Sequence, residues 1–374
     1  MKIVHVITTL DVGGAEMHLL SQVRGQSERG HKVSVFYLKG MGTLADDFRG
    51  AGASLVEQTK PFFWPLFRAM RSADIVHSHL LKADALVSVL ATVSGNRSCL
   101  ISGKHNDEQV LKRPLVSLIH SVLGNLPRVT IVLSDHVGRF VEEFGRVRHR
   151  ALRRVYYGID PAPFIEAAEV PKLERDQARA EFGFEPDDRV FICVARFAPQ
   201  KAHDVLLRAF SRAHASDDSI RLLLVGDDPF GDGRQRATAL AEELGLGKNV
   251  VFAGIRRDVP ALIALSDVFV MSSLWEGLGL VFLEAMAAGL PVLSSGVSAV
   301  PEVVIDGETG LLVPPADDEA LAEGFKRLAA HEELCESLGR AGRARVLAVF
   351  GLDRMVEETL AIYREVAGGR SDSA

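Results

Sequence analysis

Short apolar runs rich in valine and isoleucine alternate along the chain with longer stretches whose apolar residues recur at helical spacing. The short runs are typical of buried strands and the longer stretches of amphipathic helices. Strands are expected at residues 2–7, 32–38, 74–77, 100–102, 130–133, 190–194, 220–225, 249–252, 267–271 and 291–294. Because parallel strands need long crossover connections, this alternation predicts parallel sheets covered by helices.

Helices are expected between and after these strands, at residues 16–29, 83–94, 202–214, 234–244, 259–265, 316–330 and 353–367. The pattern pauses between residues 161 and 188, where prolines and acidic residues occur without a strand. We therefore expect an α/β protein of two doubly wound, Rossmann-like domains at residues 1–165 and 188–352, joined by a linker at 166–187. Ligands of such sheets bind beyond the carboxyl ends of the strands, so the site should lie in a cleft between the two domains.

Length and composition agree with a two-domain soluble protein. The chain has 374 residues, more than one hydrophobic core usually fills. Its start reads as a strand and not as a signal peptide, since the apolar run is short and Asp11 follows at once. The cysteines Cys99, Cys193 and Cys335 are far apart and suggest neither disulfides nor a zinc site. A cytoplasmic location is therefore expected.

The net charge of −6 is unevenly distributed. Residues 1–160 carry 21 lysines and arginines against 14 acidic residues, a net charge of +7, and the remainder carries −13. A basic half could bind an anionic membrane surface, a phosphorylated lipid or a nucleic acid. A charge fluctuation spread over the surface explains the imbalance equally well.

The stretch SSLWEGLGLVFLEAMAAGLPVLSS carries the most chemical information. Its carboxylates, Glu276 and Glu284, lie eight residues apart. Gly277 and Gly279 precede a helical segment that starts at Leu280. A strand, a glycine turn and a helix N-terminus together present free backbone N–H groups to an anion. Glu284, about two turns into the helix, should lie beside that anion and Glu276 at its mouth, where both acids could hold sugar hydroxyls.

This stretch resembles the Glu-x7-Glu signature of retaining glycosyltransferases of family 4, which have the two-domain GT-B fold. Leu278 stands where a phenylalanine is more usual. An ordinary buried strand–helix unit with two surface acids is the alternative, and the ordered set of acids and glycines argues against it. The resemblance covers nearly the whole chain and implies that the last helix, in segment 353–374 with its mobile tail, crosses back to the first domain. It also matches YYGID to the family's linker entrance, with Tyr157 in place of asparagine, so this residue should matter mainly to the hinge.

Two cations follow the first strand of the second half. Arg196 and Lys201 project from the loop ahead of an amphipathic helix. An arginine gives two parallel hydrogen bonds and a lysine supplies a point charge, so the pair suits a diphosphate. The segment resembles a Gly-Arg and Lys-Gly element of the family, with Ala195 and Ala202 in place of the glycines. Taken alone, both cations would be ordinary surface charges.

Three further sites are implied chiefly by the resemblance. Gly13 and Gly14 lie between the first strand and its helix, where glycine lets backbone N–H groups approach a ligand, and the family places this loop near the donor phosphates and the acceptor. His105 matches a family histidine in contact with the transferred sugar. Ile255 and Arg256 match an element that lines the nucleobase pocket, although a strand followed by a polar turn explains them equally well.

His77 and His79 lie on one face of an expected strand, a spacing that could suggest a metal. No third or fourth ligand is evident from the sequence. The chain also has no Asp-x-Asp pair. We therefore expect no metal and no other cofactor.

Together, these residues imply a retaining glycosyltransferase, a hexosyltransferase of the EC 2.4 class. It would move a sugar from a nucleotide-sugar, with a UDP-sugar preferred, to a hydroxyl of a glycan or lipid-linked acceptor in cell-surface polysaccharide assembly. Two alternatives stay open. One is a sugar-nucleotide-binding scaffold or sensor without turnover, and the other is a UDP-sugar epimerase of the same fold, which would need acids or bases beside the ring. No nucleic acid is expected as a partner.

The acceptor should be bound by the basic first domain. The aromatic segment 62–67 and a run of arginines could contact an anionic membrane there, which would place the protein peripherally at the inner face of the plasma membrane. The run consists of Arg146, Arg148, Arg150, Arg153 and Arg154. An aromatic patch of this kind is more often a packed loop or a helix start.

Overall fold

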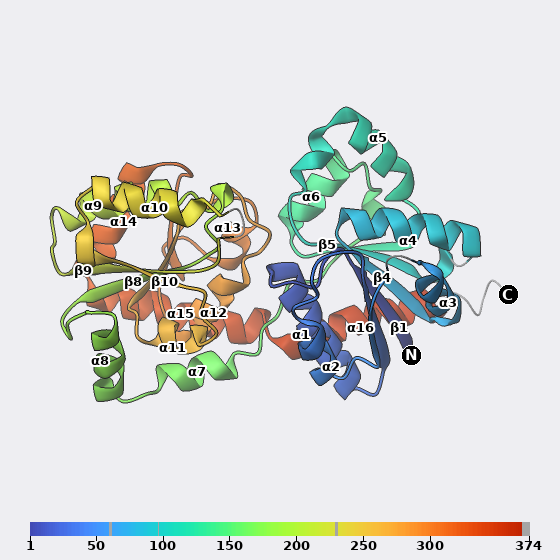
Figure 1. Cartoon of the computed structure of the whole chain (residues 1–374), viewed down its shortest axis with the longest axis horizontal. Coiled ribbons are helices and arrows are strands. Elements are labelled where there is room, and N and C mark those ends of the chain that lie inside the picture. The colour runs from blue at the N-terminus through green and yellow to red at the C-terminus, as the bar shows by residue number, and fades with distance from the viewer. Residues whose placement is uncertain (60–61, 96, 229–230, 369–374) are drawn as a thin grey trace. The chain divides into compact units, whose positions relative to one another are not determined.

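The chain folds into two units in the computed structural model, which describes residues 1–59, 62–95, 97–228 and 231–368. The first unit comprises Met1–Gly158 and Leu352–Ala374, and the second Ile159–Gly351. Figure 1 shows each unit as a sheet with helices on both faces. The prediction of two doubly wound, Rossmann-like domains is confirmed. The predicted mobile tail after Gly368 lies outside the described residues.

The first unit holds a seven-stranded sheet in the order β3-β2-β1-β4-β5-β6-β7. Its strands are β1 (Lys2–Ile7), β2 (Lys32–Tyr37), β3 (Leu55–Gln58), β4 (Ile75–His79), β5 (Leu100–Lys104), β6 (Val129–Val132) and β7 (Leu152–Arg154). All of their ladders are parallel. The sequence pattern does not predict the edge strands β3 and β7, because LVEQ and LRR contain few apolar residues. The strand order reverses between β1 and β4, where the chain crosses to the other half of the sheet.

Helices cover both faces of this sheet, with α1, α2 and α16 on one face and α3 and α4 on the other. The helices of this unit are α1 (Gly14–Glu28), α2 (Ala45–Gly50), α3 (Trp64–Ser72), α4 (Leu81–Ser94), α5 (Pro114–Leu123), α6 (Asp135–Glu143) and α16 (Leu352–Gly368). Val356, Leu360 and Tyr363 of α16 share a buried cluster with Ile3 and Ile75 of the sheet. The last helix of the chain is therefore part of the core of the first unit.

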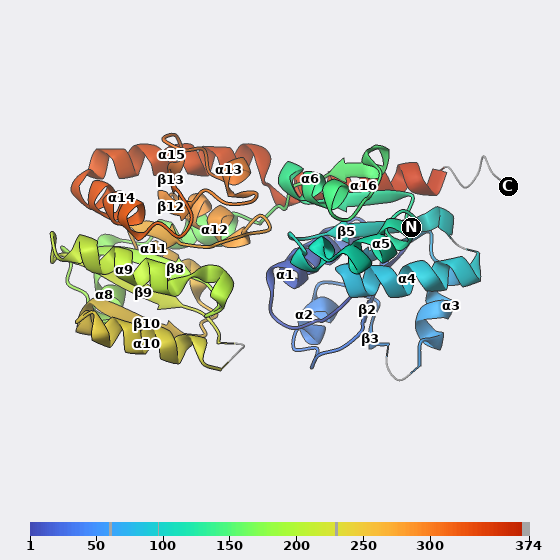
Figure 2. The ribbon, with the colours of Figure 1, turned by 90° about the horizontal axis from the view of Figure 1, so that it is seen from above.

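The second unit holds a six-stranded parallel sheet in the order β10-β9-β8-β11-β12-β13, which Figure 2 shows from one edge to the other. Its strands are β8 (Arg189–Val194), β9 (Ile220–Val225), β10 (Val250–Gly254), β11 (Val268–Met271), β12 (Val292–Ser295) and β13 (Gly310–Val313). The sequence pattern misses β13, a short strand with a glycine at its start. The strand order reverses between β8 and β11.

Helices α9, α10 and α14 lie on one face of the second sheet, and α7, α11, α12 and α15 on the other. The helices of this unit are α7 (Ala162–Ala168), α8 (Lys172–Glu181), α9 (His203–His214), α10 (Gly233–Glu243), α11 (Val259–Ala264), α12 (Leu280–Ala288), α13 (Val300–Val303), α14 (Asp318–Ala330) and α15 (Glu332–Val349). Across the described parts of both units, no helix is long and apolar enough to pass through a bilayer.

The segment expected to be a linker packs onto the second unit. Helix α7 contacts α11 and α12, and α8 is held by the buried side chain of Arg179. The guanidinium of Arg179 donates to the carbonyl oxygen of Leu265 at 2.7 Å and pairs with the carboxylate of Asp267 at 2.8 Å. Because these contacts bind both helices to the second sheet, the boundary falls after Gly158 and not at residue 165.

Arg179→Ala should destabilise the second unit. The largely buried Asp267 carboxylate would keep the backbone N–H of Val190 at 2.8 Å and two arginines, each 3.8 Å away, but would lose its close charged partner. We therefore expect the free energy of unfolding to fall by about 3 kcal/mol. The chain has two tryptophans, so in a Trp64→Phe background the fluorescence of Trp275 reports urea unfolding of the second unit.

Lys172→Ala in the same background is the control, because Lys172 forms an exposed pair with Asp176 on the same helix. That change should cost less than about 1 kcal/mol. Equal losses in the two variants would contradict the anchoring role of Arg179.

Candidate functional site

In the second unit, the loops that follow β8 and β11 meet at the carboxyl edge of the sheet. These strands are neighbours, and the strand order reverses between them. Open parallel sheets bind their ligands beside such a reversal. The two loops, 195–202 and 272–279, contain five of the twelve site residues that the sequence singles out: Arg196, Lys201, Glu276, Gly277 and Gly279.

Hydrogen bonds fix the two loops to each other. The hydroxyl of Ser272 donates to the carbonyl oxygen of Lys201 at 2.9 Å. The side-chain amide of Gln200 donates to the carbonyl oxygen of Trp275 at 2.6 Å. The relative position of the loops is therefore set by the protein itself.

This arrangement places Lys201 against Glu276. The ammonium group of Lys201 pairs with the carboxylate of Glu276, and the hydroxyl of Ser273 donates to the same carboxylate oxygen at 2.6 Å. The two charged side chains are only 13% and 5% exposed, so their charges are weakly screened. The backbone N–H of Glu276 donates to the hydroxyl of Ser298 at 3.2 Å. The sequence singled out Lys201 and Glu276, but not their ion pair and not the two serines. Of the serines, only Ser273 lies within the recognised stretch.

Arg196, the other predicted cation, lies in the same loop as Lys201 but outside this pair. Its side chain is exposed and makes no hydrogen bond or ion pair with the described residues. The loop that follows β9 packs directly against it, because a Cβ on Gly226 would lie 1.9 Å from the carbonyl oxygen of Ala195. The backbone beside Arg196 is thus fixed, while its guanidinium stays available to a ligand.

Helix α12 begins where the second loop ends. Gly279 is its N-cap with φ at +79°, a left-handed conformation that favours glycine, and no side chain caps the helix. The N–H groups of Leu280 and Val281 therefore face the loop as donors, while that of Phe282 donates to the carbonyl oxygen of Gly279 at 3.0 Å. Gly277 is half-buried in the turn before them. Glu284 lies just over one turn into α12, nearer to its start than the two turns expected.

Glu284 is a partly buried acid on this helix. No hydrogen bond joins its carboxyl group to a described residue. Burial raises the pKa of Glu284 to about 7, because the charged form loses its hydration. This carboxyl group therefore changes its charge near neutral pH.

The predicted base-binding residues follow β10 at the same edge of the sheet, with β9 between them and β8. Ile255 is 72% exposed. The guanidinium of Arg256 pairs with Asp258 at 2.5 Å and lies 5.8 Å from the ring centroid of Phe182. Arg256 is thus already engaged by its own loop, and its contact with a base stays a prediction.

In the first unit, the predicted residues lie near the reversal between β1 and β4. Gly13 is the N-cap of α1, and a Cβ there would lie 2.5 Å from a carboxylate oxygen of Glu16. Glu16 is buried and accepts a hydrogen bond from the hydroxyl of Thr9 at 2.6 Å. Gly14, the first residue of α1, has open space around it. Glycine at position 13 therefore makes room for the acid beneath the turn.

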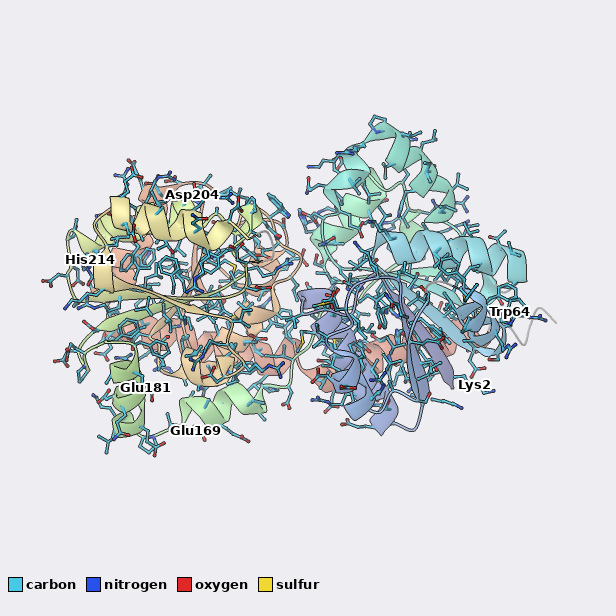
Figure 3. All side chains as sticks on the ribbon, viewed as in Figure 1. Lys2, Trp64, Glu169, Glu181, Asp204 and His214 are labelled. Carbon is cyan, nitrogen blue, oxygen red and sulfur yellow. The ribbon has the colours of Figure 1, made fainter. Side chains whose placement is uncertain are left out.

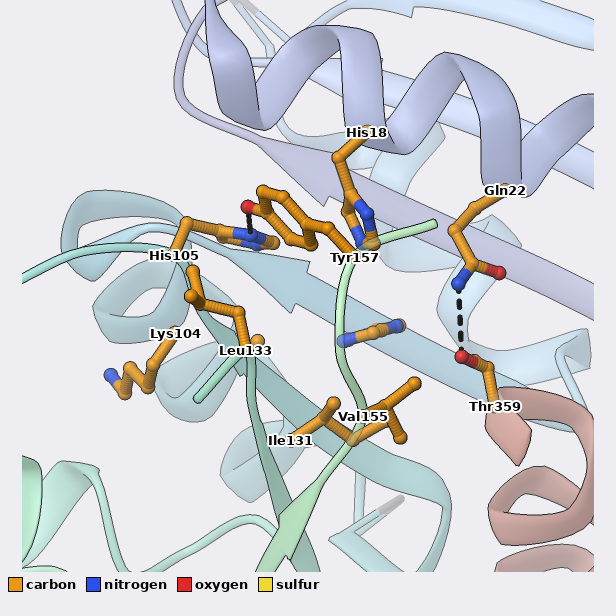
Figure 4. A pocket seen from close by; sticks show the side chains of 11 residues that line it. His18, Gln22, Lys104, His105, Ile131, Leu133, Val155, Tyr157 and Thr359 are labelled. Atoms are coloured by element: carbon orange, nitrogen blue, oxygen red, sulfur yellow. Dashed lines mark hydrogen bonds between the residues drawn. The ribbon is translucent and has the colours of Figure 1, made fainter. Parts of the chain in front are cut away.

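His105 directly follows β5 and is 7% exposed. Its Nδ1 lies 2.5 Å from the hydroxyl of Tyr157, a bond drawn in Figure 4, and its Nε2 lies 2.9 Å from Nδ1 of His79. Burial lowers the pKa of His105 to about 3, so its ring is neutral. Tyr157 lies beside the boundary between the two units, so its part in the hinge stays a prediction. The structure adds that its buried ring stacks on His18 at 3.9 Å and that its hydroxyl reaches His105.

The structure also adds a third histidine to the pair on β4. His5 of β1 pairs in register with His77, and ring nitrogens of His5, His77 and His79 lie within 4.8 Å of one another. The prediction that no third ligand is available is therefore wrong. The third histidine, His5, lies on the neighbouring strand β1, where the sequence did not show it to be close. His5 already bonds to His79 at 2.9 Å and to Gln26 at 2.9 Å, so we interpret the cluster as a hydrogen-bonded network. The absence of a metal stays a prediction.

Comparison with known proteins identifies the family. Residues 12–163 match the family described as Glycosyltransferase Family 4, and residues 174–345 match Glycosyl transferases group 1. Together these matches span most of the chain. The chain belongs to glycosyltransferase family 4 and is an EC 2.4 enzyme that transfers a sugar from a nucleotide-sugar.

Two curated relatives match over most of their own length. The GDP-mannose-dependent alpha-(1-6)-phosphatidylinositol monomannoside mannosyltransferase of Mycolicibacterium smegmatis is 29% identical over 352 residues, which cover 88% of this chain and 89% of the relative. The N-acetyl-alpha-D-glucosaminyl L-malate synthase of Bacillus anthracis is 29% identical over 303 residues, which cover 78% and 75%.

Solved structures show the same fold. Anabaena Alr3699/HepE in complex with UDP and glucose aligns with a TM-score of 0.84 at 20% identity, covering 97% of this chain and 99% of that chain. WaaG, a glycosyltransferase involved in lipopolysaccharide biosynthesis, aligns with a TM-score of 0.71 at 18% identity, covering 96% and 99%. The fold is therefore GT-B.

Glu284→Gln should change how stability depends on pH. Because burial raises the pKa of Glu284 from 4.5 to about 7, the folded protein keeps a proton that the unfolded chain releases between these values. The stability that the protonated group contributes is present below pH 4.5 and is lost as the pH rises through about 7. We expect the variant to be more stable than the wild type by up to about 3 kcal/mol at pH 8 and little changed at pH 5.

Urea unfolding followed by Trp275 fluorescence in the Trp64→Phe background measures this difference. Glu242→Gln is the matched control, since Glu242 is an exposed acid on α10 of the same unit. A pH dependence shared by both variants would refute the assignment to Glu284.

Proposed function

We propose that this enzyme moves a sugar from a UDP-sugar, with retention of the anomeric configuration, to a hydroxyl of a glycan or lipid-linked acceptor in cell-surface polysaccharide assembly. The second unit would bind the donor, and the basic first unit the acceptor. The observation that carries the proposal is the Lys201–Glu276 pair at the reversal between β8 and β11, where the loop that holds Glu276 leads into helix α12.

The leaving diphosphate gains negative charge as the glycosyl–phosphate bond breaks. Lys201, Arg196 and the N–H groups at Gly279 and Leu280 would stabilise that charge. Groups that are fixed before the reaction need no reorganisation in the transition state, and such electrostatic stabilisation is often the largest catalytic effect. The nearly buried Lys201–Glu276 pair fits this requirement, because its loops are already held in place.

The acids and the remaining predicted residues would orient the donor. Glu276 would hold hydroxyls of the transferred sugar and Glu284 those of the ribose. A carboxyl group with a pKa of about 7 can either donate or accept a hydrogen bond to a hydroxyl at neutral pH. Neither acid needs to be a covalent nucleophile. Ile255 and Arg256 would lie against the base.

Residues of the first unit would complete the substrate contacts. His105 would contact the transferred sugar, and the N–H groups at Gly13 and Gly14 would lie near the donor phosphates and the acceptor.

The donor base is the least constrained part of the proposal. The HepE structure contains UDP and glucose, whereas the Mycolicibacterium relative is GDP-mannose-dependent. UDP is preferred as the commonest donor of the family.

A donor panel tests this proposal. UDP-, GDP- and ADP-sugars are incubated with the wild type, Lys201→Ala and Lys248→Ala, while thermal shift reports binding and nucleotide release in the presence of acceptor extract reports turnover. We expect UDP-sugars to stabilise the wild type and to turn over, and Lys201→Ala to lose about 10²–10³ in rate while staying folded. Lys248→Ala, an exposed lysine of the same unit, should match the wild type.

Each alternative has its own outcome in this panel. Binding without turnover by any donor would favour the scaffold or sensor. Conversion of a UDP-sugar to its epimer without acceptor would favour the epimerase. Full transfer activity in Lys201→Ala would refute the role of the lysine in leaving-group stabilisation.

The cytoplasmic face of an anionic membrane is the proposed location, and helix α5 is the proposed contact. This helix buries Ser117 and His120 and exposes four apolar side chains at helical spacing. They are Leu115, Leu118, Ile119 and Val122, with exposed fractions of 69%, 56%, 52% and 63%. Lys112 and Arg113, both exposed, precede the helix. An apolar helix face beside cations suits an anionic lipid surface.

The aromatic segment 62–67, also expected to touch the membrane, begins with exposed side chains, and its membrane contact stays a prediction. Phe62 and Trp64 are 74% and 60% exposed, and Figure 3 shows Trp64 at the surface of the first unit. Trp64 starts helix α3, whose Leu66 and Met70 are buried in the core. The residues at 60–61 lie outside the described residues.

Leu118→Glu should weaken membrane binding by about tenfold, because burying one leucine contributes about 1.5–3 kcal/mol. Co-sedimentation with phosphatidylglycerol-containing vesicles at low salt measures the bound fraction. Leu173→Glu is the control, since Leu173 is a 68% exposed leucine on α8 of the second unit. A wild-type protein that stays wholly in the supernatant, or equal losses in the two variants, would count against α5 as the contact.

A further inference from the structure

A continuous row of buried polar side chains crosses the first unit from Tyr157 to helix α16. Each member lies within hydrogen-bonding distance of the next, between 2.5 and 3.2 Å. The row consists of Tyr157, His105, His79, His5, Gln26, Gln22 and Thr359, and ends at the carbonyl group of Met355. The glycosyl-transfer mechanism uses only His105 from this row.

At the α16 end of the row, the donor and the acceptor of each hydrogen bond are defined. The hydroxyl of Thr359 donates to the carbonyl oxygen of Met355 at 2.8 Å, so its oxygen accepts from the amide nitrogen of Gln22 at 2.9 Å. The carbonyl oxygen of Gln22 in turn accepts from the amide nitrogen of Gln26 at 3.2 Å. This leaves Oε1 of Gln26, which can only accept, facing Nε2 of His5 at 2.9 Å.

The same order of donor and acceptor continues along the histidines, since a neutral imidazole has one donor nitrogen and one acceptor nitrogen. Burial lowers the pKa of His5 to about 4 and that of His105 to about 3, and it also lowers the pKa of His79. Nε2–H of His5 donates to Gln26, so Nδ1 of His5 accepts from His79 at 2.9 Å. Nδ1 of His79 then accepts from Nε2–H of His105 at 2.9 Å. Nδ1 of His105 must accept, and the Tyr157 hydroxyl donates to it at 2.5 Å.

We propose that Tyr157 is a positioning residue for His105, which it holds as the Nε2–H tautomer with its ring in one orientation. At one end of the row the Tyr157 hydroxyl donates a hydrogen bond to His105. At the other end the carbonyl oxygen of Met355 can only accept, and this fixes which atom donates in every bond between them. The inference rests on the proposed function, in which His105 contacts the transferred sugar. Because both ring nitrogens bond within the row, the His105 ring would meet the sugar in one fixed orientation, and a ring that rotated would move that contact.

The packing around the row supports one fixed arrangement. Tyr157 is 4% exposed and is held by the ring of His18 stacked 3.9 Å away, as seen beside it in Figure 4. A Cβ on Gly103 would lie 3.0 Å from Nε2 of His105 and 3.1 Å from Nδ1 of His79. The two rings therefore meet where a side chain is missing, and they have little room to rotate.

Tyr157→Phe tests the proposal, with Tyr156→Phe as the matched control at the neighbouring position. Long-range proton–nitrogen NMR on protein labelled with ¹⁵N in histidine reports the tautomer of His105, whose signals are assigned by their loss in His105→Asn. We expect the wild type and Tyr156→Phe to show Nε2–H, and Tyr157→Phe to show a mixture of tautomers. The kcat for sugar transfer should fall on the order of tenfold in Tyr157→Phe, as for the loss of about one hydrogen bond, and stay unchanged in Tyr156→Phe.

Thr359→Val provides a second test from the far end of the row, and it works even if Tyr157→Phe folds poorly. Thr359 bonds to Gln22 and Met355 in this row and not to His105. Without its hydroxyl, nothing at this end fixes which atom of each pair in the row donates the hydrogen bond. The same nitrogen signals of His105 should then change.

The NMR measurement needs no substrate, so it separates this inference from the proposed function. A wild type with the Nδ1–H tautomer, or unchanged His105 signals in both Tyr157→Phe and Thr359→Val, would overturn the inference. A changed tautomer with unchanged transfer kinetics would overturn the positioning role. A wild type that transfers sugar from no donor in the panel would defeat the proposed function, whatever the NMR result.

Discussion

The order of strands in the two parallel sheets decides where the reactive side chains of this protein lie. In each sheet the chain starts in the middle, builds one half and then crosses to build the other. The loops after the two central strands therefore start next to each other and lead to helices on opposite faces. The Lys201–Glu276 pair occupies that position in the second sheet, and the histidine row passes through His79 and His5 of the corresponding strands, β4 and β1, of the first. Residues far apart in the chain meet there because the crossover makes β1 and β4, and β8 and β11, neighbours.

The two units use opposite electrostatic solutions for their buried polar groups. In the second unit, Lys201 and Glu276 form an ion pair, with the Ser273 hydroxyl donating to the carboxylate. In the first unit, burial lowers the pKa of His5 and His105 far below neutrality, so the histidines stay uncharged and bond to one another. An ion pair suits the binding of a charged diphosphate, whereas a neutral row suits the fixing of one ring in one tautomer.

Helix α5 shows how burial can reverse the pattern that sequence reading relies on. Its polar residues Ser117 and His120 face inward because they bond to the carbonyl groups of Phe144 and Gly145 at 2.6 and 2.7 Å. Its apolar residues Leu118 and Val122 face solvent. A hydrophobic stripe at helical spacing identifies a helix, but it does not tell whether the stripe faces the core or a partner.

The sequence by itself determined the α/β class and most of the central strands, and it singled out Lys201 and Glu276 separately, because apolar periodicity and motif order are local properties of the chain. That these two side chains form an ion pair was decided by the fold. The sequence did not reveal the edge strands β3 and β7, whose few apolar residues leave no periodic signal. It also did not reveal the partnership of Tyr157 with His105 or of His5 with His77. These contacts exist only once strands and loops distant in sequence are placed side by side, and that placement is decided by packing in three dimensions.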